Sequence, residues 1–507
     1  MYALTARGMR FMDNYAIEAG IPSAVLMENA AKGIVDEIVS RFPDKKTGIL
    51  VVCGTGNNGG DAVAAARWLI HLGYSNVKVY VAGSLSSTSQ EFARQITILS
   101  KAYKGVDVSG INGRNDKNTL NYKYDVIVDG IFGLGLNKTL DDGMSRLIEF
   151  LNAKSAYRIA IDIPSGLHAT SGMMMPTAFK ADLTLTFGNY KTGLFFGAGK
   201  ECCGEVKVID IGLIDSAYEN IADKLIVCDK EFLDEHRNLD LVTRSETGHK
   251  GTFGTVGVVV GVNGMLGASI LAAKAAYRAG CGLVKIFCPA KFIGFFNVSV
   301  PEAVVVPYKA DDIVGELDDF MKDIDSILIG PGLKEDTVGR LLVKQILASN
   351  VPAVIDAGAL NIISRNLKSF RKRKCPCVIT PHLGEMAKLC GDDINVIAQN
   401  RIGYTRKFSE KFAVSMVVKS DVSLLALLNP NGEQELFINT IGNSGLATAG
   451  SGDVLAGVIA SLIAQGNTLN NSLLYGVMLH GRSAEKYASD SDSKRKMMAG
   501  DIVDNLF

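Results

Sequence analysis

The sequence predicts two fused α/β domains, the first of them built on a doubly wound parallel sheet. With 507 residues, the chain is too long for a single hydrophobic core. Short apolar runs alternate with segments of helical periodicity along most of its length. A glycine-rich turn that carries an aspartate stands near either end, at residues 54–61 and 449–453. Glycine lets backbone amides converge on an anion at a helix N-terminus, so we expect two domains that bind phosphorylated small molecules.

The first half of the chain alternates between predicted helix and predicted strand. Residues 23–38 have the apolar periodicity of an amphipathic helix. Five short apolar runs follow, which we predict to be buried strands: 49–53, 77–81, 126–128, 159–161 and 183–187. Strands that are buried on both faces and separated by helices are typical of a parallel sheet. This pattern ends after Leu213, and we place the domains at residues 1–224 and 225–507.

The second half returns to alternating elements after a glycine-rich segment at 248–254. We predict a strand at 256–260 and an alanine-rich helix at 268–279. Five further strands are predicted: 283–288, 326–329, 353–355, 377–379 and 416–419. The two halves share no repeated motif, so we interpret them as different folds joined by fusion.

Composition and charge argue against several classes of protein. Lys plus Arg and Asp plus Glu both number 53, so no net field favours nucleic acid or an anionic membrane. No apolar stretch approaches the roughly 20 residues of a membrane span, and the first residues lack the apolar core of a secretory signal. We therefore expect a cytoplasmic protein. The nine cysteines lack the paired spacing of a zinc site, which favours reduced structural thiols.

The first glycine-rich turn lies between a predicted strand and a predicted helix, and residues 54–59 match G-x-G-x-x-G. A dinucleotide-binding fold also needs an acidic residue at the end of the next strand, and residues 79–83 contain none. Two later strand ends carry polar side chains instead, namely Asp129 and the pair Asp162 and Ser165. Ligands of open α/β sheets bind at the carboxyl ends of the strands, so we predict that these loops line one pocket.

Four motifs of the first half together resemble the YjeF N-terminal domain, the NAD(P)H-hydrate epimerase, which has a Rossmann-like sheet. The motifs are Gly-Asn-Asn-Gly-Gly-Asp61, Asp129-Gly-Ile-Phe-Gly, Asp162-Ile-Pro-Ser-Gly166 and Thr186-Phe-Gly-Asn-Tyr-Lys191. The resemblance runs from about Thr5 to Leu213. One departure is Ala62, where the family usually has glycine.

This resemblance implies a binding site for the hydrated nicotinamide nucleotide. Asp162 would contact the substrate and act as the acid/base group for epimerisation at C6. Asn58, Asp129 and Ser165 would bind a potassium ion, since oxygen ligands of this kind can hold one. Two loops would bind the substrate, and they consist of Asn57, Asn58, Gly59, Gly60, Asp61, Gly133, Leu134, Gly135, Leu136, Asn137, Lys138 and Thr139.

The second glycine-rich turn precedes a predicted helix at 454–463. Backbone amides at such a helix start can neutralise phosphate oxygens, and Asp453 can act as a base on a hydroxyl or water. A plain helix cap would also favour Ser, Asp and Gly. The full run at 439–453 is longer than a cap needs, and it resembles the anion-hole segment of ribokinase-like enzymes.

Five further motifs narrow this second resemblance to the YjeF C-terminal domain, the NAD(P)H-hydrate dehydratase, over roughly residues 225–507. The motifs lie at 249–254, 267–273, 329–333, 356–361 and 380–385. The resemblance implies that Asp453 assists phosphorylation of the hydrate hydroxyl before phosphate is lost. The hydrated nucleotide would contact Ala268, Gly332, His382 and Asp453. The phosphate donor, ADP with Mg²⁺, would contact Lys419, Ser420, Asp421, Val422, Ser423 and Gly452.

Several positions of the second half depart from the usual family pattern. Gly358 stands where the family usually has aspartate, so one carboxylate near the site is missing. Asp356, Asn361 and Glu385 remain in place. Four smaller departures are Lys334, Ser420, Ser444 and Ala449.

The leading hypothesis is a bifunctional repair enzyme that epimerises R and S hydrates of NADH and NADPH and dehydrates the S form at the expense of ADP. An alternative is a ribokinase-like small-molecule kinase with a ligand-sensing N-terminal domain. The substrate that supports nucleotide turnover would distinguish the two hypotheses. A third hypothesis is a binding or scaffold protein. The presence of Asp61, Asp129 and Asp162 argues against it. We expect a homo-oligomer whose other partners are small molecules, with no nucleic acid and no membrane.

Overall fold

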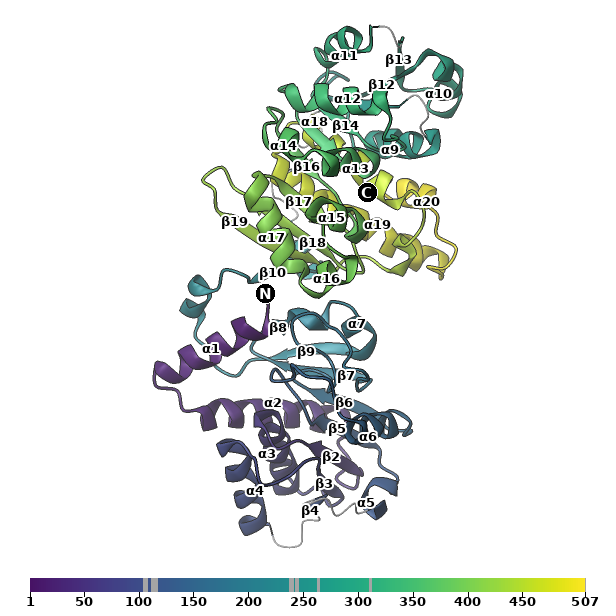
Figure 1. The fold of residues 1–507 in the computed structure, drawn as a ribbon. Helices are drawn as coiled ribbons and strands as arrows, with labels where there is room; N and C mark the ends of the chain where they lie inside the picture. The colour runs from purple at the N-terminus through teal and green to yellow at the C-terminus, as the bar shows by residue number, and fades with distance from the viewer. Residues whose placement is uncertain are drawn as a thin grey trace. The chain divides into compact units, whose positions relative to one another are not determined.

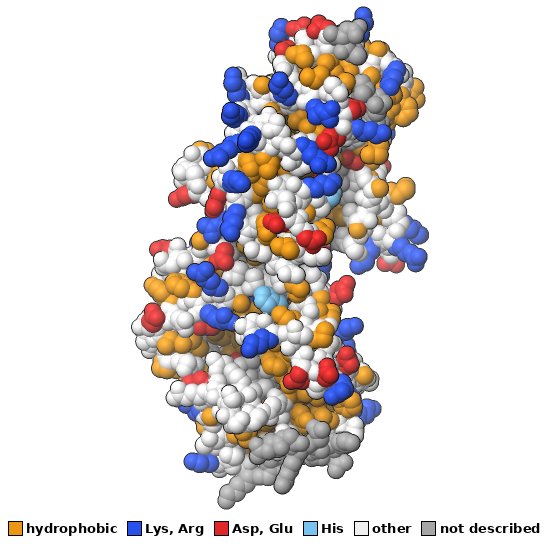
Figure 2. Space-filling model, in the orientation of Figure 1, with side chains coloured by type: hydrophobic (Ala, Val, Ile, Leu, Met, Phe, Trp, Pro, Cys, Tyr) orange, Lys and Arg blue, Asp and Glu red, His pale blue; other side chains and the backbone are white. Residues whose placement is uncertain are grey.

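The computed structural model describes residues 1–103, 108–110, 117–236, 241, 246–261, 265–309 and 312–506. The chain divides into two compact units, Met1–Leu225 and Ile226–Phe507 (Figure 1). This division lies beside the boundary that the sequence predicts. Figure 2 shows both basic and acidic side chains on the visible face of each unit. Among the described helices, none has the length and apolar character required to cross a membrane.

A seven-stranded parallel sheet forms the centre of the first unit. Its strand order is β4-β3-β2-β5-β6-β7-β9, and every neighbouring pair is parallel. The order reverses between β2 and β5, which makes the carboxyl ends of these two strands the switch point at which such sheets bind ligands. The strands are β2 (Ile49–Cys53), β3 (Val77–Val81), β4 (Val108–Ser109), β5 (Val126–Gly130), β6 (Tyr157–Ile161), β7 (Leu183–Phe187) and β9 (Glu205–Ile209).

Helices cover both faces of this sheet, as the doubly wound prediction requires. On one face, Val51 packs in a buried cluster with residues of α2, α3 and α4. On the other face, Leu50 and Val52 pack with Ile148 and Leu151 of α6. The remaining elements are β1 (Tyr2–Leu4), which pairs in parallel with β8 (Tyr190–Lys191), and the helices α1 (Ala6–Glu18), α2 (Ser23–Arg41), α3 (Asn57–His71), α4 (Gln90–Ala102), α5 (Lys117–Asn121), α6 (Asp142–Asn152) and α7 (Gly199–Cys202), with 3-10 turns at Thr192–Leu194 and Asp215–Asn220.

The second unit contains a larger sheet of mixed direction. Its order is β13-β12-β11-β14-β15-β16-β17-β18-β19-β10, parallel from β13 to β17 and antiparallel across β17, β18 and β19. Here the order reverses between β11 and β14. The strands are β10 (Leu225–Cys228), β11 (Thr255–Val259), β12 (Leu283–Pro289), β13 (Val304–Tyr308), β14 (Ser326–Ile329), β15 (Ala353–Ile355), β16 (Cys377–Ile379), β17 (Ser415–Val418), β18 (Ser423–Leu428) and β19 (Gln434–Asn439).

The core of this unit is formed by α9 and α18, which approach each other closely. A Cβ at Gly457 of α18 would lie 2.2 Å from the carbonyl oxygen of Ala272 on α9, so only glycine permits the contact. The helices of the unit are α8 (Lys230–Glu235), α9 (Leu266–Arg278), α10 (Ile293–Ser299), α11 (Ile313–Met321), α12 (Thr337–Ala348), α13 (Ala357–Arg365), α14 (Leu367–Arg371), α15 (Leu383–Cys390), α16 (Ile394–Gln399), α17 (Arg401–Phe412), α18 (Ser451–Ala464), α19 (Leu469–Ser491) and α20 (Ala499–Asp504), with 3-10 turns at Ala290–Phe292 and Ser444–Leu446.

The predicted strands are largely confirmed, and the main differences concern helix starts. The strands predicted at 49–53, 77–81 and 183–187 match β2, β3 and β7 residue for residue. Both glycine-rich turns, by contrast, are partly helical. Because α3 begins at Asn57 and α18 at Ser451, Asp61 and Asp453 lie within these helices rather than ahead of them.

Candidate functional sites

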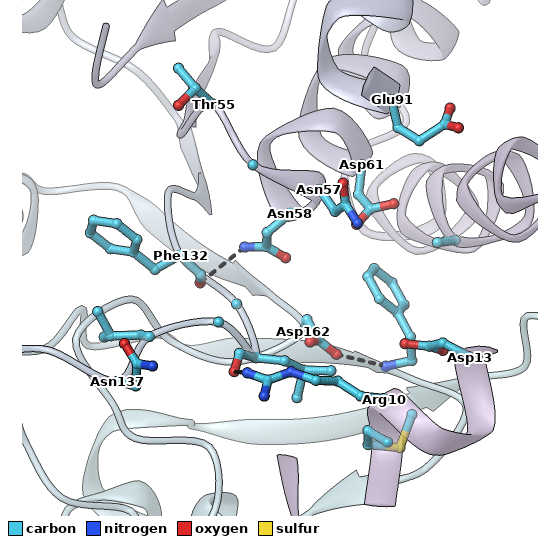
Figure 3. A pocket seen from close by; sticks show the side chains of 18 of the residues that line it. Arg10, Asp13, Thr55, Asn57, Asn58, Asp61, Glu91, Phe132, Asn137 and Asp162 are labelled. Atoms are coloured by element: carbon cyan, nitrogen blue, oxygen red, sulfur yellow. Dashed lines mark hydrogen bonds between the residues drawn. The ribbon is translucent and has the colours of Figure 1, made fainter. Parts of the chain in front are cut away.

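A cavity of about 910 Å³ opens at the switch point of the first sheet (Figure 3). It is lined by α1 and by the loops that follow β2, β5 and β6. Most of the substrate-binding residues implied for this half line it together: Asn57, Asn58, Asp61, Gly133, Leu134, Gly135, Leu136, Asn137, Lys138, Thr139 and Asp162.

Gly59 and Gly60 do not line the cavity. A Cβ at Gly59 would lie 1.9 Å from the carbonyl oxygen of Gly54, and one at Gly60 would lie 2.6 Å from the Met27 side chain. These two glycines therefore allow the turn and helix α3 to pack closely.

A buried lysine holds the carboxylate of Asp162. The Lys191 side chain is 0% exposed, and its Nζ lies 2.5 Å from Asp162 Oδ1. The same ammonium donates to Thr186 Oγ1 at 2.9 Å and to the carbonyl oxygen of Phe187 at 2.7 Å. The Phe187 N–H donates to Asp162 Oδ1 at 3.3 Å. Lys191 is thus fully bonded, and Asp162 presents an ion-paired carboxylate to the cavity.

Of the other carboxyl groups that line the same space, Asp13 and Asp61 are held differently from Asp162. Burial raises the pKa of Asp13 on α1 to about 6, because the counteracting charge of Lys191 only partly offsets desolvation and the charge of Asp162. Burial together with the charges of Asp162 and Asp13 raises the pKa of Asp61 well above its usual range. Asp13 belongs to none of the sequence motifs, so it was not predicted as a site residue.

The three residues implied as potassium ligands meet beside the Phe132 backbone. The Ser165 hydroxyl donates to Asp129 Oδ1 at 2.7 Å, and the Ser165 N–H donates to Asp129 Oδ2 at 2.8 Å. The Asn58 amide donates to the carbonyl oxygen of Phe132 at 3.0 Å (Figure 3). Asp129 is 0% exposed, and burial raises its pKa to about 6. Carboxylate, hydroxyl and carbonyl oxygens converge here, which is a donor set that fits K⁺.

Helix α1 also holds the loop that closes one side of the cavity. The Arg10 guanidinium donates to the carbonyl oxygen of Leu134 at 2.9 Å, and Arg10 itself lines the cavity (Figure 3). The motifs gave no signal for Arg10, because its partner lies far along the chain.

In the second unit, the implied site residues follow neighbouring strands. The loops after β14, β15, β16 and β17 emerge at one edge because these strands are parallel. At this edge Lys419 Nζ donates to Asp356 Oδ1 at 2.8 Å, with side chains that are 20% and 2% exposed. A Cβ at Gly452 would lie 3.1 Å from Lys419 Nζ. The structure therefore brings the glycine turn of α18 against Lys419.

Asp453 belongs to a cluster of acidic side chains around Lys419. Burial and the charge of Asp356 raise the pKa of Asp453 to about 6, although Lys419 acts in the opposite direction. Burial and the same Asp356 charge raise the pKa of Glu385. A carboxyl whose pKa lies near neutrality can accept a proton from a hydroxyl. The sequence motifs contain Asp356 and Glu385 but indicate no role for them.

His382 caps helix α15. Its Nδ1 accepts the N–H groups of Gly384 and Glu385, while the Glu385 carboxylate accepts the His382 N–H. This capping box leaves the imidazole side chain 58% exposed. His382 also bridges in parallel to Lys419, so it lies at the same edge of the sheet.

Part of the implied nucleotide-binding stretch is tied to α17. Arg401 donates to Ser420 Oγ at 3.0 Å and to Asp421 Oδ1 at 2.8 Å. Val422 is buried, and Ser423 begins β18. Arg401 holds the turn after Lys419, and the sequence analysis missed it.

A buried histidine lies behind the glycine turn of α18. Gly450 has a φ of 91°, a left-handed conformation that suits glycine. His480 Nε2 lies 3.0 Å from the carbonyl oxygen of Ser451 and 3.2 Å from its hydroxyl. Burial lowers the pKa of His480 to about 4, so its imidazole is neutral at pH 7. The contact to Ser451 fixes the first turn of α18, just ahead of Asp453.

Two glycines explain how the loops after β14 and β15 fit together. Gly332 has a φ of 70°, and a Cβ there would lie 2.4 Å from the carbonyl oxygen of Met265. This contact places Gly332 beside the start of α9, which carries Ala268 in its first turn. A Cβ at Gly358 would lie 1.9 Å from the carbonyl oxygen of Leu333. The backbone at position 358 therefore approaches Leu333 too closely for an aspartate side chain to fit without a shift of the loop.

Over the described part of the chain, no group of three or more His, Cys, Asp or Glu side chains could hold a metal ion. All nine cysteines are free, and all but Cys390 are buried.

Comparisons with known proteins match both units. The family model for NAD(P)H-hydrate dehydratase matches residues 256–506, and that for the YjeF-related protein N-terminus matches residues 23–193. The chain is 33% identical to the bifunctional NAD(P)H-hydrate repair enzyme of Moorella thermoacetica, over 100% of this chain and 96% of that protein. It is 29% identical to the Escherichia coli enzyme of the same name, over 96% and 89% of the two chains. A crystal structure of ADP/ATP-dependent NAD(P)H-hydrate dehydratase from Bacillus subtilis, with ATP and Mg²⁺, is 29% identical, covers 56% of this chain and 96% of that one, and has a TM-score of 0.48.

Proposed function

This chain belongs to the family of bifunctional NAD(P)H-hydrate repair enzymes, and we propose that its two units catalyse the two steps of that repair. The first unit interconverts the R and S hydrates of NADH and NADPH. The second unit dehydrates the S hydrate with consumption of ADP, forming AMP and phosphate. The single observation that carries this proposal is the end-to-end relationship to the Moorella thermoacetica enzyme, which spans both units.

In the first step, the hydrated nicotinamide ring lies in the cavity and its C6 faces Asp162. The geometry supports this assignment, because the Lys191 ammonium pairs with the Asp162 carboxylate at a cavity that is also lined by residues of the loops at 57–61 and 133–139. An ionised carboxylate at C6 can take a proton from an attacking water. The residues that we assign to substrate binding are those that line the cavity.

A potassium ion fits beside this site. Asn58, Asp129 and Ser165 would hold it, together with the carbonyl oxygen of Phe132. When bound, the ion supplies a fixed positive charge near the loop that follows β5. Replacing K⁺ by Li⁺ in the assay should slow epimerisation and leave the dehydration of pure S hydrate unchanged.

In the second step, Asp453 accepts the proton of the hydrate hydroxyl while that oxygen attacks the β-phosphate of ADP. The backbone N–H groups at the start of α18 and the Lys419 ammonium face the transferred phosphate. Mg²⁺, when bound with the nucleotide, neutralises charge on the phosphate oxygens. Phosphorylation turns the hydroxyl into a good leaving group, and loss of phosphate with the proton on C5 restores the dihydronicotinamide.

The test is recovery of 340 nm absorbance from mixed R and S hydrates of NADH with Mg²⁺, K⁺ and either ADP or ATP. We expect complete recovery with ADP. Recovery that stops when the S hydrate is consumed would contradict the epimerase assignment alone. Absence of recovery with either nucleotide would contradict the dehydratase assignment, and nucleotide turnover with another hydroxyl substrate would instead identify a small-molecule kinase.

A further inference from the structure

Helix α1 brings into the first site a carboxyl group that no motif identifies. Asp13 lines the cavity together with Asp162, and Figure 3 shows the two side chains facing the same space from different elements. Asp13 lies ahead of residues 23–193, which the family model of this unit matches. Among the described residues it makes no hydrogen bond and no ion pair. A partly buried carboxyl group aimed into a cavity without a partner needs an explanation.

The charges around the cavity require that some of its carboxyl groups carry a proton. Asp13, Asp61 and Asp162 face a single buried ammonium, that of Lys191. If all three were ionised, three negative charges would lie near one buried positive charge in a partly buried space, which is costly. Asp162 is the carboxyl group that pairs with Lys191, and it also accepts the N–H of Phe187. The protons therefore belong to Asp13 and Asp61.

Asp13 and Asp61 differ in how firmly they hold a proton. The positive charge of Lys191 lowers the cost of ionising Asp13, whose pKa lies at about 6. Asp61 has further acidic neighbours in Asp13, Asp162 and Glu91, and its pKa is raised well above its usual range. A group that titrates near neutrality can both give and take a proton, whereas burial and its acidic neighbours make Asp61 harder to ionise than Asp13. The other charged groups at the cavity are Arg10 on α1, Glu91 on α4, and Lys138 and Asp141 on the segment between β5 and α6.

We propose that Asp13 is the general acid of the first site, with Asp162 as the partner base and Lys191 as the counter-charge that both carboxyl groups share. This inference rests on the proposed epimerisation. It assigns a catalytic role to α1, a helix that lies outside the matched part of the family model.

The reaction balances in protons and electrons. Asp13 gives its proton to the C6 hydroxyl, the C6–O bond breaks, and water leaves while the N1 lone pair forms a C6=N1 double bond. Water then adds to the opposite face of C6, the electron pair returns to N1, and the released proton goes to Asp162. One proton has moved from Asp13 to Asp162, so the net charge beside Lys191 is unchanged. The reverse direction uses the same two groups with their roles exchanged.

The experiment measures interconversion of purified R and S hydrates of NADH in the full-length protein. We expect Asp13→Asn to lower kcat for epimerisation by at least about 100-fold with little change in KM, the usual contribution of a general acid. The wild-type rate should fall above an apparent pKa near 6, and this limb should vanish in Asp13→Asn. Asp13→Glu should restore part of kcat and the limb. Glu18→Gln, an exposed acidic position on the same helix, is the matched control and should behave as wild type.

Dehydration of pure S hydrate by the second unit, in the same polypeptide, reports whether each variant is intact. An Asp13→Asn rate within about threefold of wild type would overturn the proposal, and so would loss of the high-pH limb in Asp61→Asn but not in Asp13→Asn. The proposal would also be overturned if Asp13→Asn and Asp13→Glu lowered thermal stability and raised KM equally while the high-pH limb of the rate remained. Asp13 would then be a structural residue. A wild-type protein that does not interconvert the hydrates would instead defeat the proposed function of the first unit.

Discussion

Each unit pairs a lysine with an aspartate near the carboxyl edge of its sheet, but the two pairs expose opposite partners. In the first unit the Lys191 side chain is 0% exposed and the Asp162 side chain 8%. In the second unit Lys419 is 20% exposed and Asp356 only 2%. The accessible group is thus a carboxylate in one site and an ammonium in the other.

The hydrogen bonds of the two lysines reinforce this contrast. Lys191 donates to Asp162, Thr186 and Phe187, so all three of its N–H groups are used. Lys419 donates to Asp356 alone among the described residues, which leaves N–H groups for another acceptor. The same residue pair therefore serves proton transfer in the first unit and phosphate binding in the second.

The largest effect that would test this contrast is expected from Asp453→Asn. Asparagine cannot take the proton of the hydrate hydroxyl, so nucleotide-dependent dehydration should fall by about 10³-fold. Epimerisation should stay unchanged, because Asp453 lies in the other unit. The measurement is 340 nm recovery from pure S hydrate, with Asp504→Asn on α20 as the control. Retained dehydration would remove Asp453 from the mechanism.

Gly358→Asp would add a carboxyl group to the second site, at the position where the family usually has aspartate. The new Cβ would lie 1.9 Å from the carbonyl oxygen of Leu333, so the loop must move. We expect the free energy of unfolding of the second unit to fall by about 3 kcal/mol and the dehydration rate to fall with it. Calorimetry and the S-hydrate assay check this. A faster enzyme of unchanged stability would show that the missing carboxylate, rather than the close contact, limits the site.

The same charge-conserving substitution in both pairs separates a buried lysine from an accessible one. Lys191→Arg must fit a larger head group into a fully enclosed space and should destabilise the first unit by about 2 kcal/mol. Lys419→Arg alters a side chain that is 20% exposed and should cost under about 1 kcal/mol, with nucleotide KM changed less than about threefold. Thermal unfolding of the two variants measures these losses. Equal losses would contradict the difference in burial between Lys191 and Lys419.

His480→Asn tests whether the contacts between His480 and Ser451 are needed to position the backbone amides at the start of α18. Loss of the bonds to Ser451 should raise the nucleotide KM by about 5-fold, because one buried hydrogen bond is worth about 1 kcal/mol. His236→Asn, which alters a half-buried histidine at the end of α8, is the control. A fall in kcat with unchanged KM would indicate that His480 acts on Asp453 rather than on the phosphate site.

The smallest expected effect is a difference in the pH dependence of the two activities. Asp453 must be ionised to act as a base and its pKa is raised to about 6, so dehydration of S hydrate should decline as the pH falls below about 6. Asp13 must be protonated to act as an acid and its pKa also lies at about 6, so epimerisation should decline as the pH rises above about 6. Rates measured separately from pH 5 to 8.5 check this. Parallel profiles would contradict the assignment of opposite roles.

The local sequence determined the architecture and most of the loops that meet at each site. Buried strands such as β2 and β7 were predicted to the residue because continuous apolar runs bounded by turns need no distant partner to be recognised. Glycines and polar residues after parallel strands, such as Asp129 and Asp162, could be assigned to one edge because parallel strand ends must meet there. The antiparallel pairing of β18 and β19 was not predicted.

Only the tertiary structure decided which side chains act on one another. Asp13 and Arg10 belong to a helix without any motif, and they enter the first site because α1 folds back over distant loops. Lys191 stands in a motif, but its full burial and its bond to Asp162 depend on the packing around β7 and β8. Likewise, the sequence shows only a missing carboxylate at Gly358, whereas the structure shows that the Leu333 carbonyl oxygen lies too close for a side chain at this position. Burial and long-range contact set charge states, and neither leaves a signal in the neighbouring residues of the chain.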